Sequence, residues 1–164
     1  MRKALGRRLA RFLSRQDPAC STSPPTNQAL LKRALRPGDV LLVEGTSMIA
    51  AAIKYLTQST WAHAALYVGA GDGRAANSGS VHWFIEADLI EGVRIVSVDH
   101  FAQFHCRICR PVGLSEQDVD RVIAHAMRRV GRAYDTRNVI DLARYLLPTP
   151  PVPSAWRRKM IAFG

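Results

Sequence analysis

The sequence predicts an α+β fold, in which an antiparallel β-sheet of about five strands packs against helices. Five short apolar runs recur in the middle of the chain at intervals typical of a meandering antiparallel sheet. The order of the segments, with helices before and after most of these runs, is typical of α+β proteins. Hydrophobic residues make up 48% of the 164 residues, which is enough for a packed core in a chain of single-domain length.

Periodicity and capping residues locate the individual elements. Apolar runs bounded by turn residues predict strands at 40–44, 63–69, 82–87, 92–98 and 105–112. Apolar residues at helical spacing predict helices at 3–15, 28–36, 46–58, 115–131 and 135–147. Ser47 is the expected N-cap of the third helix. Ser115 is the expected N-cap of the fourth, where Asp118 completes a variant of the capping box.

Charge divides the sequence into a basic arm and a nearly neutral body. Residues 1–36 contain nine Lys and Arg and one acid, giving +8 of the total charge of +10. The remaining 14 basic and 12 acidic residues give +2. We expect residues 1–35 to form a basic helical arm followed by a Pro/Ser linker, and residues 36–164 to form the folded domain. Because this body carries little net charge, we do not expect a dedicated nucleic-acid-binding domain.

The arm begins with the pattern of a short amphipathic helix. In KALGRRLARFLSR, residues 3–15, arginines fill the faces that are left by the apolar residues Leu5, Leu9, Phe12 and Leu13. Such a helix can lie on an anionic membrane surface, or it can be a solvated helix without a special role, and the pattern leaves both interpretations open. The expected membrane contact is peripheral, at the inner membrane face, through residues 1–15.

Cysteine usage and hydropathy predict a cytoplasmic protein. Cys20, Cys106 and Cys109 are odd in number and follow no recognisable secretory signal, which argues against a disulfide framework. No run approaches the ~18 apolar residues that a transmembrane helix needs. The expected location is therefore the cytoplasm.

A histidine opens the second predicted strand. Side chains alternate along a strand, so His63 and Tyr67 share one face, and Phe84 and Glu86 share a face of the next strand. Neighbouring strands lie ~4.8 Å apart, which allows Glu86 to hydrogen-bond the His63 imidazole. The pair either satisfies two polar groups among apolar strands or forms a catalytic pair, in which the carboxylate fixes the tautomer and leaves the other ring nitrogen as a base.

Four segments resemble, in this order, the landmarks of the circularly permuted papain-like cysteine hydrolases. They are RPGDVLLVEGTS, WAHAALYVG, FIEA and VGRAYD. The resemblance covers roughly residues 36–164 and is to the NlpC-type branch that contains the YiiX and YebB-like proteins. It implies a permuted papain-like fold for the body of the chain.

The resemblance also implies roles for individual residues. In the permuted order a histidine on a strand comes first, a polar partner on the next strand follows, and a cysteine nucleophile at a helix start comes last. His63 matches the catalytic histidine and Glu86 matches its acidic partner. Tyr134, in the segment before the nucleophile region, either lines the substrate cleft or packs at a helix start. Trp61 either forms a wall of the cleft or packs.

The nucleophile that the resemblance implies is missing from its position. It would follow a segment like WRRKMIAFG, but the sequence given ends at Gly164 and contains no cysteine after Cys109. We therefore expect a domain that is incomplete at its C-terminus and inactive in this form. Cys106 and Cys109 face opposite sides of a predicted strand and come too early in the chain to replace it. With His105 they have a spacing seen in metal sites, but a zinc ion needs a fourth ligand, and we expect neither a metal nor another cofactor.

These inferences lead to two expected functions. The first is a cysteine hydrolase of the amidase or peptidase type, or an acyltransferase, that acts on an amide or ester of a peptide, a protein or a lipid acyl group. The second is a non-catalytic binding protein on the same scaffold, which docks to an anionic membrane or to nucleic acid through its basic arm. The missing nucleophile is the main support for the second.

Overall fold

The structure is a computed structural model that describes residues 14–15, 21, 23–71 and 81–133. The expected amphipathic helix up to residue 13, and every residue from Tyr134 onward, lie outside the described residues. The helix expected at 135–147 lies outside them as well.

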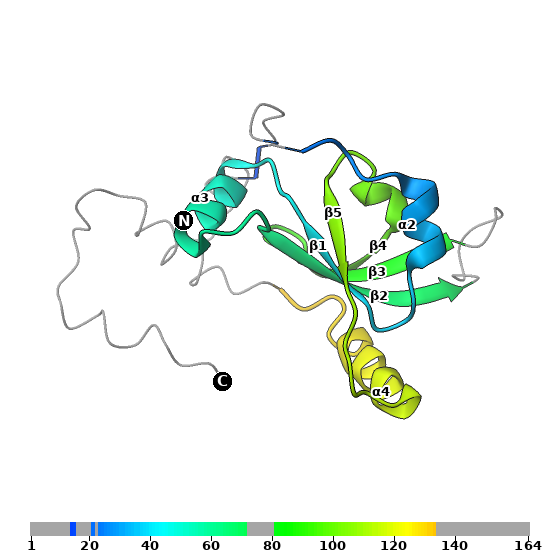
Figure 1. Cartoon of the computed structure of the whole chain (residues 1–164). Helices are drawn as coiled ribbons and strands as arrows, with labels where there is room; N and C mark the ends of the chain where they lie inside the picture. The colour runs from blue at the N-terminus through cyan, green and yellow to red at the C-terminus, as the bar shows by residue number, and fades with distance from the viewer. Residues whose placement is uncertain (1–13, 16–20, 22, 72–80, 134–164) are drawn as a thin grey trace. The chain divides into compact units, whose positions relative to one another are not determined.

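Five strands form one antiparallel sheet, which confirms the predicted fold class (Figure 1). The strands are β1 (Val40–Val43), β2 (His63–Gly71), β3 (Val81–Asp88), β4 (Gly92–Ser97) and β5 (Cys106–Cys109). Their order across the sheet is β4-β3-β2-β1-β5. The first four strands therefore form the predicted meander, whereas β5 returns to the other edge and pairs with β1.

Three α-helices and one 3-10 helix accompany the sheet in the described part of the chain. They are α2 (Gln28–Ala34), α3 (Met48–Thr57), η2 (Val98–Phe101) and α4 (Glu116–Met127). The predicted caps are confirmed: the Ser47 side chain accepts a hydrogen bond from Ala50 N, and Ser115 and Asp118 form a capping box. Helix α4 ends at Met127, before the predicted end at Gly131, because residues 128–131 continue as turns.

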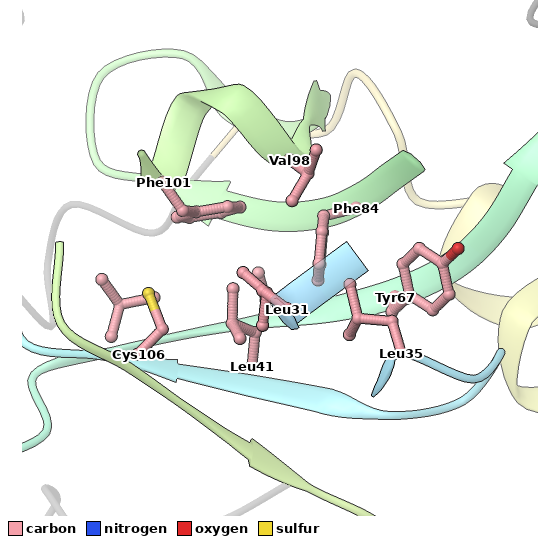
Figure 2. Close-up of a cluster of buried hydrophobic side chains, with 10 residues drawn as sticks. Leu31, Leu35, Leu41, Tyr67, Phe84, Val98, Phe101 and Cys106 are labelled. Atoms are coloured by element: carbon pink, nitrogen blue, oxygen red, sulfur yellow. The ribbon is translucent and has the colours of Figure 1, made fainter. Parts of the chain in front are cut away.

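One face of the sheet carries the hydrophobic core (Figure 2). The strands contribute Leu41, Val43, Ala65, Tyr67, Phe84 and Cys106. Leu31 and Leu35 from the α2 segment cover this face together with Val98 and Phe101 from η2. Phe84 lies at the centre, with ring centroids 5.1 Å from Tyr67 and 5.2 Å from Phe101. The core thus includes leucines that precede residue 36.

The RPGD turn fixes the start of β1 to both neighbouring strands. Asp39 is buried, and its carboxylate accepts hydrogen bonds from Arg36 N at 2.7 Å and from the Arg110 guanidinium at 2.7 and 2.8 Å. Gly38, with φ of +88°, donates its N–H to Tyr67 O. A positive φ favours glycine at this position. The turn thereby fixes the position of β1 along β2 and along the end of β5.

Candidate active site

Strand register brings the candidate site residues to one face of the sheet. Ala65 of β2 lies opposite Glu86 of β3, and Glu86 lies opposite Arg94 of β4. Directly opposed residues of antiparallel strands point to the same side, and so do residues two apart on one strand. His63, Glu86 and Arg94 therefore lie in a diagonal row across three neighbouring strands, on the face that carries the core.

The structure brings His63 and Glu86 together as a hydrogen-bonded pair. The His63 Nε2 atom lies 2.8 Å from Glu86 Oε2. The Glu86 side chain is only 3% exposed, whereas that of His63 is 34% exposed. The carboxylate is thus almost fully withdrawn from water, while the imidazole remains accessible at the edge of the core.

Two further side chains contact the same carboxylate. Arg94 approaches Glu86 Oε1 with Nε at 2.8 Å and Nη2 at 2.7 Å. His100 Nε2 lies 3.5 Å from the same oxygen and 3.4 Å from Arg94 Nη2. Sequence reasoning assigned no role to either residue. The signal was present for Arg94, because alternation along GVRIVSV places it on a defined face, but its pairing partner required the register.

The electrostatics of the cluster keep Glu86 ionised. Burial raises the pKa of the Glu86 carboxyl, but the hydrogen bonds from His63 and Arg94 and the charges of His63 and His100 outweigh it, so the pKa lies below its usual value. An ionised carboxylate can only accept hydrogen bonds, so His63 Nε2 carries the proton. Nδ1 then holds the lone pair of the neutral ring, and it makes no hydrogen bond to the residues that the structure describes. The pair can therefore accept a proton at His63 Nδ1.

Of the two predicted cleft residues, Trp61 contacts another ring and Tyr134 is not described. Trp61 stacks on His105, with ring centroids 5.5 Å apart, and its role in a cleft stays a prediction. Tyr134 lies outside the described residues. His82, which shares the Glu86 face of β3, is instead engaged by Tyr67, whose hydroxyl lies 2.7 Å from His82 Nδ1.

Neither described cysteine lies where the His63 imidazole could deprotonate it. Val43 of β1 is the register partner of both His63 and Cys106, so Cys106 lies two strand spacings, ~10 Å, from the histidine. Burial raises the pKa of the Cys106 thiol to about 12. Cys109 is exposed and, three residues further along β5, points to the opposite face. These positions agree with the expectation that the two thiols face opposite sides.

An apolar groove of about 300 Å³ lies on the other face of the sheet, beside α4. Its lining includes side chains from β1 to β4 and α4, among them Val40, Ala64, Leu66, Ile85, Val93 and Ala126. Ala64 and Leu66 alternate with His63 along β2 and therefore point away from the imidazole side. The groove is thus separated from the His63 imidazole by the sheet.

The described residues offer neither a metal site nor a membrane-spanning helix. They contain no group of three or more His, Cys, Asp and Glu side chains arranged to hold a metal ion. None of the helices formed by residues 23–71 and 81–133 has the length and apolar character that crossing a membrane requires.

A comparison with models of protein families identifies a match for most of the chain. Residues 34–145 match the protein family described as "Permuted papain-like amidase enzyme, YaeF/YiiX, C92 family". The matched range is more than half of the chain, and it includes all five strands, His63 and Glu86. No curated protein matches the sequence.

Proposed function

The chain belongs to the permuted papain-like amidase family, and we propose that it serves amide or ester cleavage through a Cys-His-Glu triad in which His63 is the base and Glu86 orients it. The observation that supports these roles is the 2.8 Å hydrogen bond between His63 Nε2 and a buried, ionised Glu86. This contact leaves Nδ1 as the basic atom of a ring that is partly exposed. A carboxylate held in this way also stabilises the imidazolium that forms during proton transfer.

The proposed reaction has two stages, the formation of a thioester and its cleavage. His63 Nδ1 first takes the proton of the nucleophilic thiol, and the thiolate attacks the carbonyl carbon of the substrate. When the carbon–nitrogen or carbon–oxygen bond breaks, the imidazolium returns the proton to the leaving amine or alcohol, and the acyl group remains as a thioester. In the second stage Nδ1 takes a proton from water, or from another acceptor in an acyltransferase, whose oxygen or nitrogen attacks the thioester. The acyl group leaves on that oxygen or nitrogen, and the departing thiolate takes back the proton that the imidazolium holds.

The nucleophile of this proposal is neither Cys106 nor Cys109. The high thiol pKa of Cys106 and the position of Cys109 on the opposite face disqualify them, since an attacking thiol must be ionised close to the imidazole. The family order puts the nucleophile after the VGRAYD segment. We therefore propose that the 164-residue chain carries the base and its partner but does not turn over substrate by itself.

The test begins with the DNA that follows the codon of Gly164. We expect the same reading frame, or one shifted by a single base, to encode a Cys-Ser or Cys-Thr segment. The protein extended through that segment should cleave an amide or ester, and His63→Ala should abolish the cleavage. An extended protein that retains its activity without His63, or a 164-residue chain with full activity of its own, would refute the proposed triad.

The second candidate function is docking to an anionic surface through the basic arm. Its support is the charge of +8 within residues 1–36 together with the amphipathic pattern of residues 3–15. In this proposal the protein is cytoplasmic and lies at the inner membrane face. Binding to vesicles that contain anionic lipid should weaken as salt rises and should be lost on deletion of residues 1–15. Binding that is insensitive to salt and to the deletion contradicts the docking proposal, and preference for nucleic acid over vesicles contradicts its membrane form.

A further inference from the structure

We propose that Arg94 is a positioning residue that fixes the Glu86 carboxylate and, through it, the tautomer of His63. The consequence for catalysis rests on the proposed function, because it matters only if His63 is the base. The geometric claim does not depend on catalysis. It rests on the contacts of three side chains that reach across β2, β3 and β4.

The two oxygens of Glu86 serve different partners. Oε2 contacts His63 Nε2 at 2.8 Å, whereas Oε1 receives Arg94 Nε and Nη2 at 2.8 and 2.7 Å. A carboxylate that is held by one oxygen alone can rotate about its last bond and exchange the two oxygens. The guanidinium holds Oε1 through the hydrogen bond from Nε–H and the ion-pair contact of Nη2, so this rotation is opposed and Oε2 stays directed at the imidazole.

Arg94 is itself held on its outer side. Its Nη1 lies 2.6 Å from a Glu91 carboxylate oxygen, and its Nη2 lies 3.7 Å from Asp88 Oδ2. Asp88 and Glu91 flank the tight turn between β3 and β4, where Asp88 Oδ1 also accepts hydrogen bonds from the N–H groups of Ile90 and Glu91. The turn residues therefore fix the guanidinium independently of its contact with Glu86. A positioning group needs such independent support.

Arg94 also keeps the buried Glu86 carboxylate ionised. The Glu86 side chain is 3% exposed, and the only other described cationic contacts to it are the titratable imidazoles of His63 and His100. Arginine remains charged at every pH of interest, so its contact keeps Glu86 an acceptor even when both imidazoles are neutral. An acceptor at Oε2 requires the proton of neutral His63 to be on Nε2. In the neutral ring, Arg94 thereby keeps the proton on Nε2 and leaves Nδ1 free to accept one.

The test is nitrogen NMR of the His63 ring in the full chain, with Arg94→Met, Arg94→Lys and a matched control, Arg121→Met. Arg121 forms an ion pair with Asp118 on α4, remote from this cluster in the sheet. At high pH we expect one tautomer, protonated at Nε2, in the wild-type protein and in Arg121→Met. Arg94→Met should show both tautomers and about tenfold faster exchange of the Nε2 proton with water. Arg94→Lys should restore part of the Nε2 preference.

The alternative outcomes separate the possible failures. If folded Arg94→Met keeps the single Nε2 tautomer and the wild-type exchange rate, Arg94 serves only stability and the inference is overturned. If Arg94→Met does not fold, Arg94→Lys carries the same test, because a lysine retains the charge but lacks the guanidinium Nε–H that hydrogen-bonds Oε1. In that case an unchanged exchange rate overturns the inference. A tautomer that depends on Arg94 in a protein whose cleavage survives His63→Ala would support the inference while refuting the proposed function.

Discussion

At the scale of single residues, the candidate site depends on a buried carboxylate whose charge is balanced by neighbouring side chains. Glu86 is among the few buried charged residues of the described chain, and it is surrounded by His63, Arg94 and His100. A buried carboxylate without such partners would be strongly unfavourable. The residues that direct the proton chemistry are therefore also residues that the fold needs to keep satisfied.

Replacing Glu86 by glutamine should change how stability depends on pH. The pKa of Glu86 in the folded protein lies below its ordinary value of 4.5, so the unfolded chain takes up the proton first as pH falls. The stabilisation by ionised Glu86 is therefore fully present above that ordinary value and is lost as pH falls through the lower, folded value. Urea unfolding from pH 7 to pH 3 should show the difference between wild type and Glu86→Gln shrinking below pH 4.5. The other carboxylates are the same in both proteins, so their titration cancels in the comparison. A difference in unfolding free energy that stays constant with pH would count against the ionised pair.

The two described cysteines should differ in reactivity. Burial raises the pKa of Cys106 to about 12, whereas Cys109 is exposed. Only thiolates react quickly with iodoacetamide, so at pH 8 Cys109 should be alkylated fast and Cys106 only after unfolding. Peptide mass spectrometry identifies the labelled site and separates both cysteines from Cys20, and Cys109→Ser is the control that removes the labelling of Cys109. Rapid labelling of Cys106 in the folded protein would mean that this thiol is far more accessible than the structure shows.

The alternation of side chains along strands was sufficient to predict part of the candidate site from the sequence. It placed His63 and Glu86 on compatible faces, because the period of a strand is fixed by backbone geometry. It did not identify Arg94 as the second partner, because that contact depends on the register between β3 and β4. The register between β2 and β3 shifts between Tyr67 and Gly69, and a shift of this kind has no unambiguous signature in a single sequence.

At the scale of elements, the RPGD turn comes into close contact with α4 at one glycine. A methyl group added at Gly38 would lie 2.8 Å from a Val119 methyl carbon of α4, and φ at this glycine is +88°. Both the backbone conformation and the close approach therefore require glycine here. The turn that anchors β1 therefore also approaches α4 closely at Val119.

Gly38→Ala should lower the free energy of unfolding by about 1–3 kcal/mol. Two causes contribute, and Val119→Ala separates them, because it removes the steric contact and leaves the backbone strain. In urea unfolding the double variant should be less destabilised than the sum of the two single variants. Purely additive effects would show that the contact with Val119 makes no contribution.

Helix starts were predicted more accurately than helix ends. Ser47 and Ser115 were identified because N-capping is a local interaction between a side chain and nearby backbone N–H groups. The end of α4 was predicted at Gly131, but the helix ends at Met127, since the last residues of a helix compete with turn geometries that periodicity does not reveal. The packing of the 3-10 helix η2 over the core was not foreseen.

At the scale of the whole molecule, one aromatic cluster connects the sheet to the 3-10 helix that packs on it. Phe84 is fully buried and lies between Tyr67 of β2 and Phe101 of η2. Phe84 is also two residues before Glu86 on the same face of β3, so the core and the candidate site share a strand. The position of β5 beside β1, rather than beside β4, was not predictable, because pairing between distant strands has no local sequence signal.

Phe84→Ala should destabilise the protein by about 3–5 kcal/mol, because it leaves a cavity between three elements. Tyr55→Ala is a suitable control, since the Tyr55 side chain on α3 is exposed. Its effect should stay within about 0.5 kcal/mol. Urea unfolding monitored by tryptophan fluorescence measures both. Equal effects at the two positions would show that the packing around Phe84 is not the centre of the core.

The measurement that tests the account most directly is a pH titration of the His63 ring nitrogens by NMR, in the wild-type protein and in Glu86→Gln. If the ionised carboxylate holds Nε2, the proton that leaves as pH rises comes from Nδ1, and Nε2 stays protonated. In Glu86→Gln this preference should weaken, since an amide oxygen is a weaker acceptor than a carboxylate. Loss of the proton from Nε2 in the wild-type protein would contradict the account, because Nδ1 could then not serve as the base.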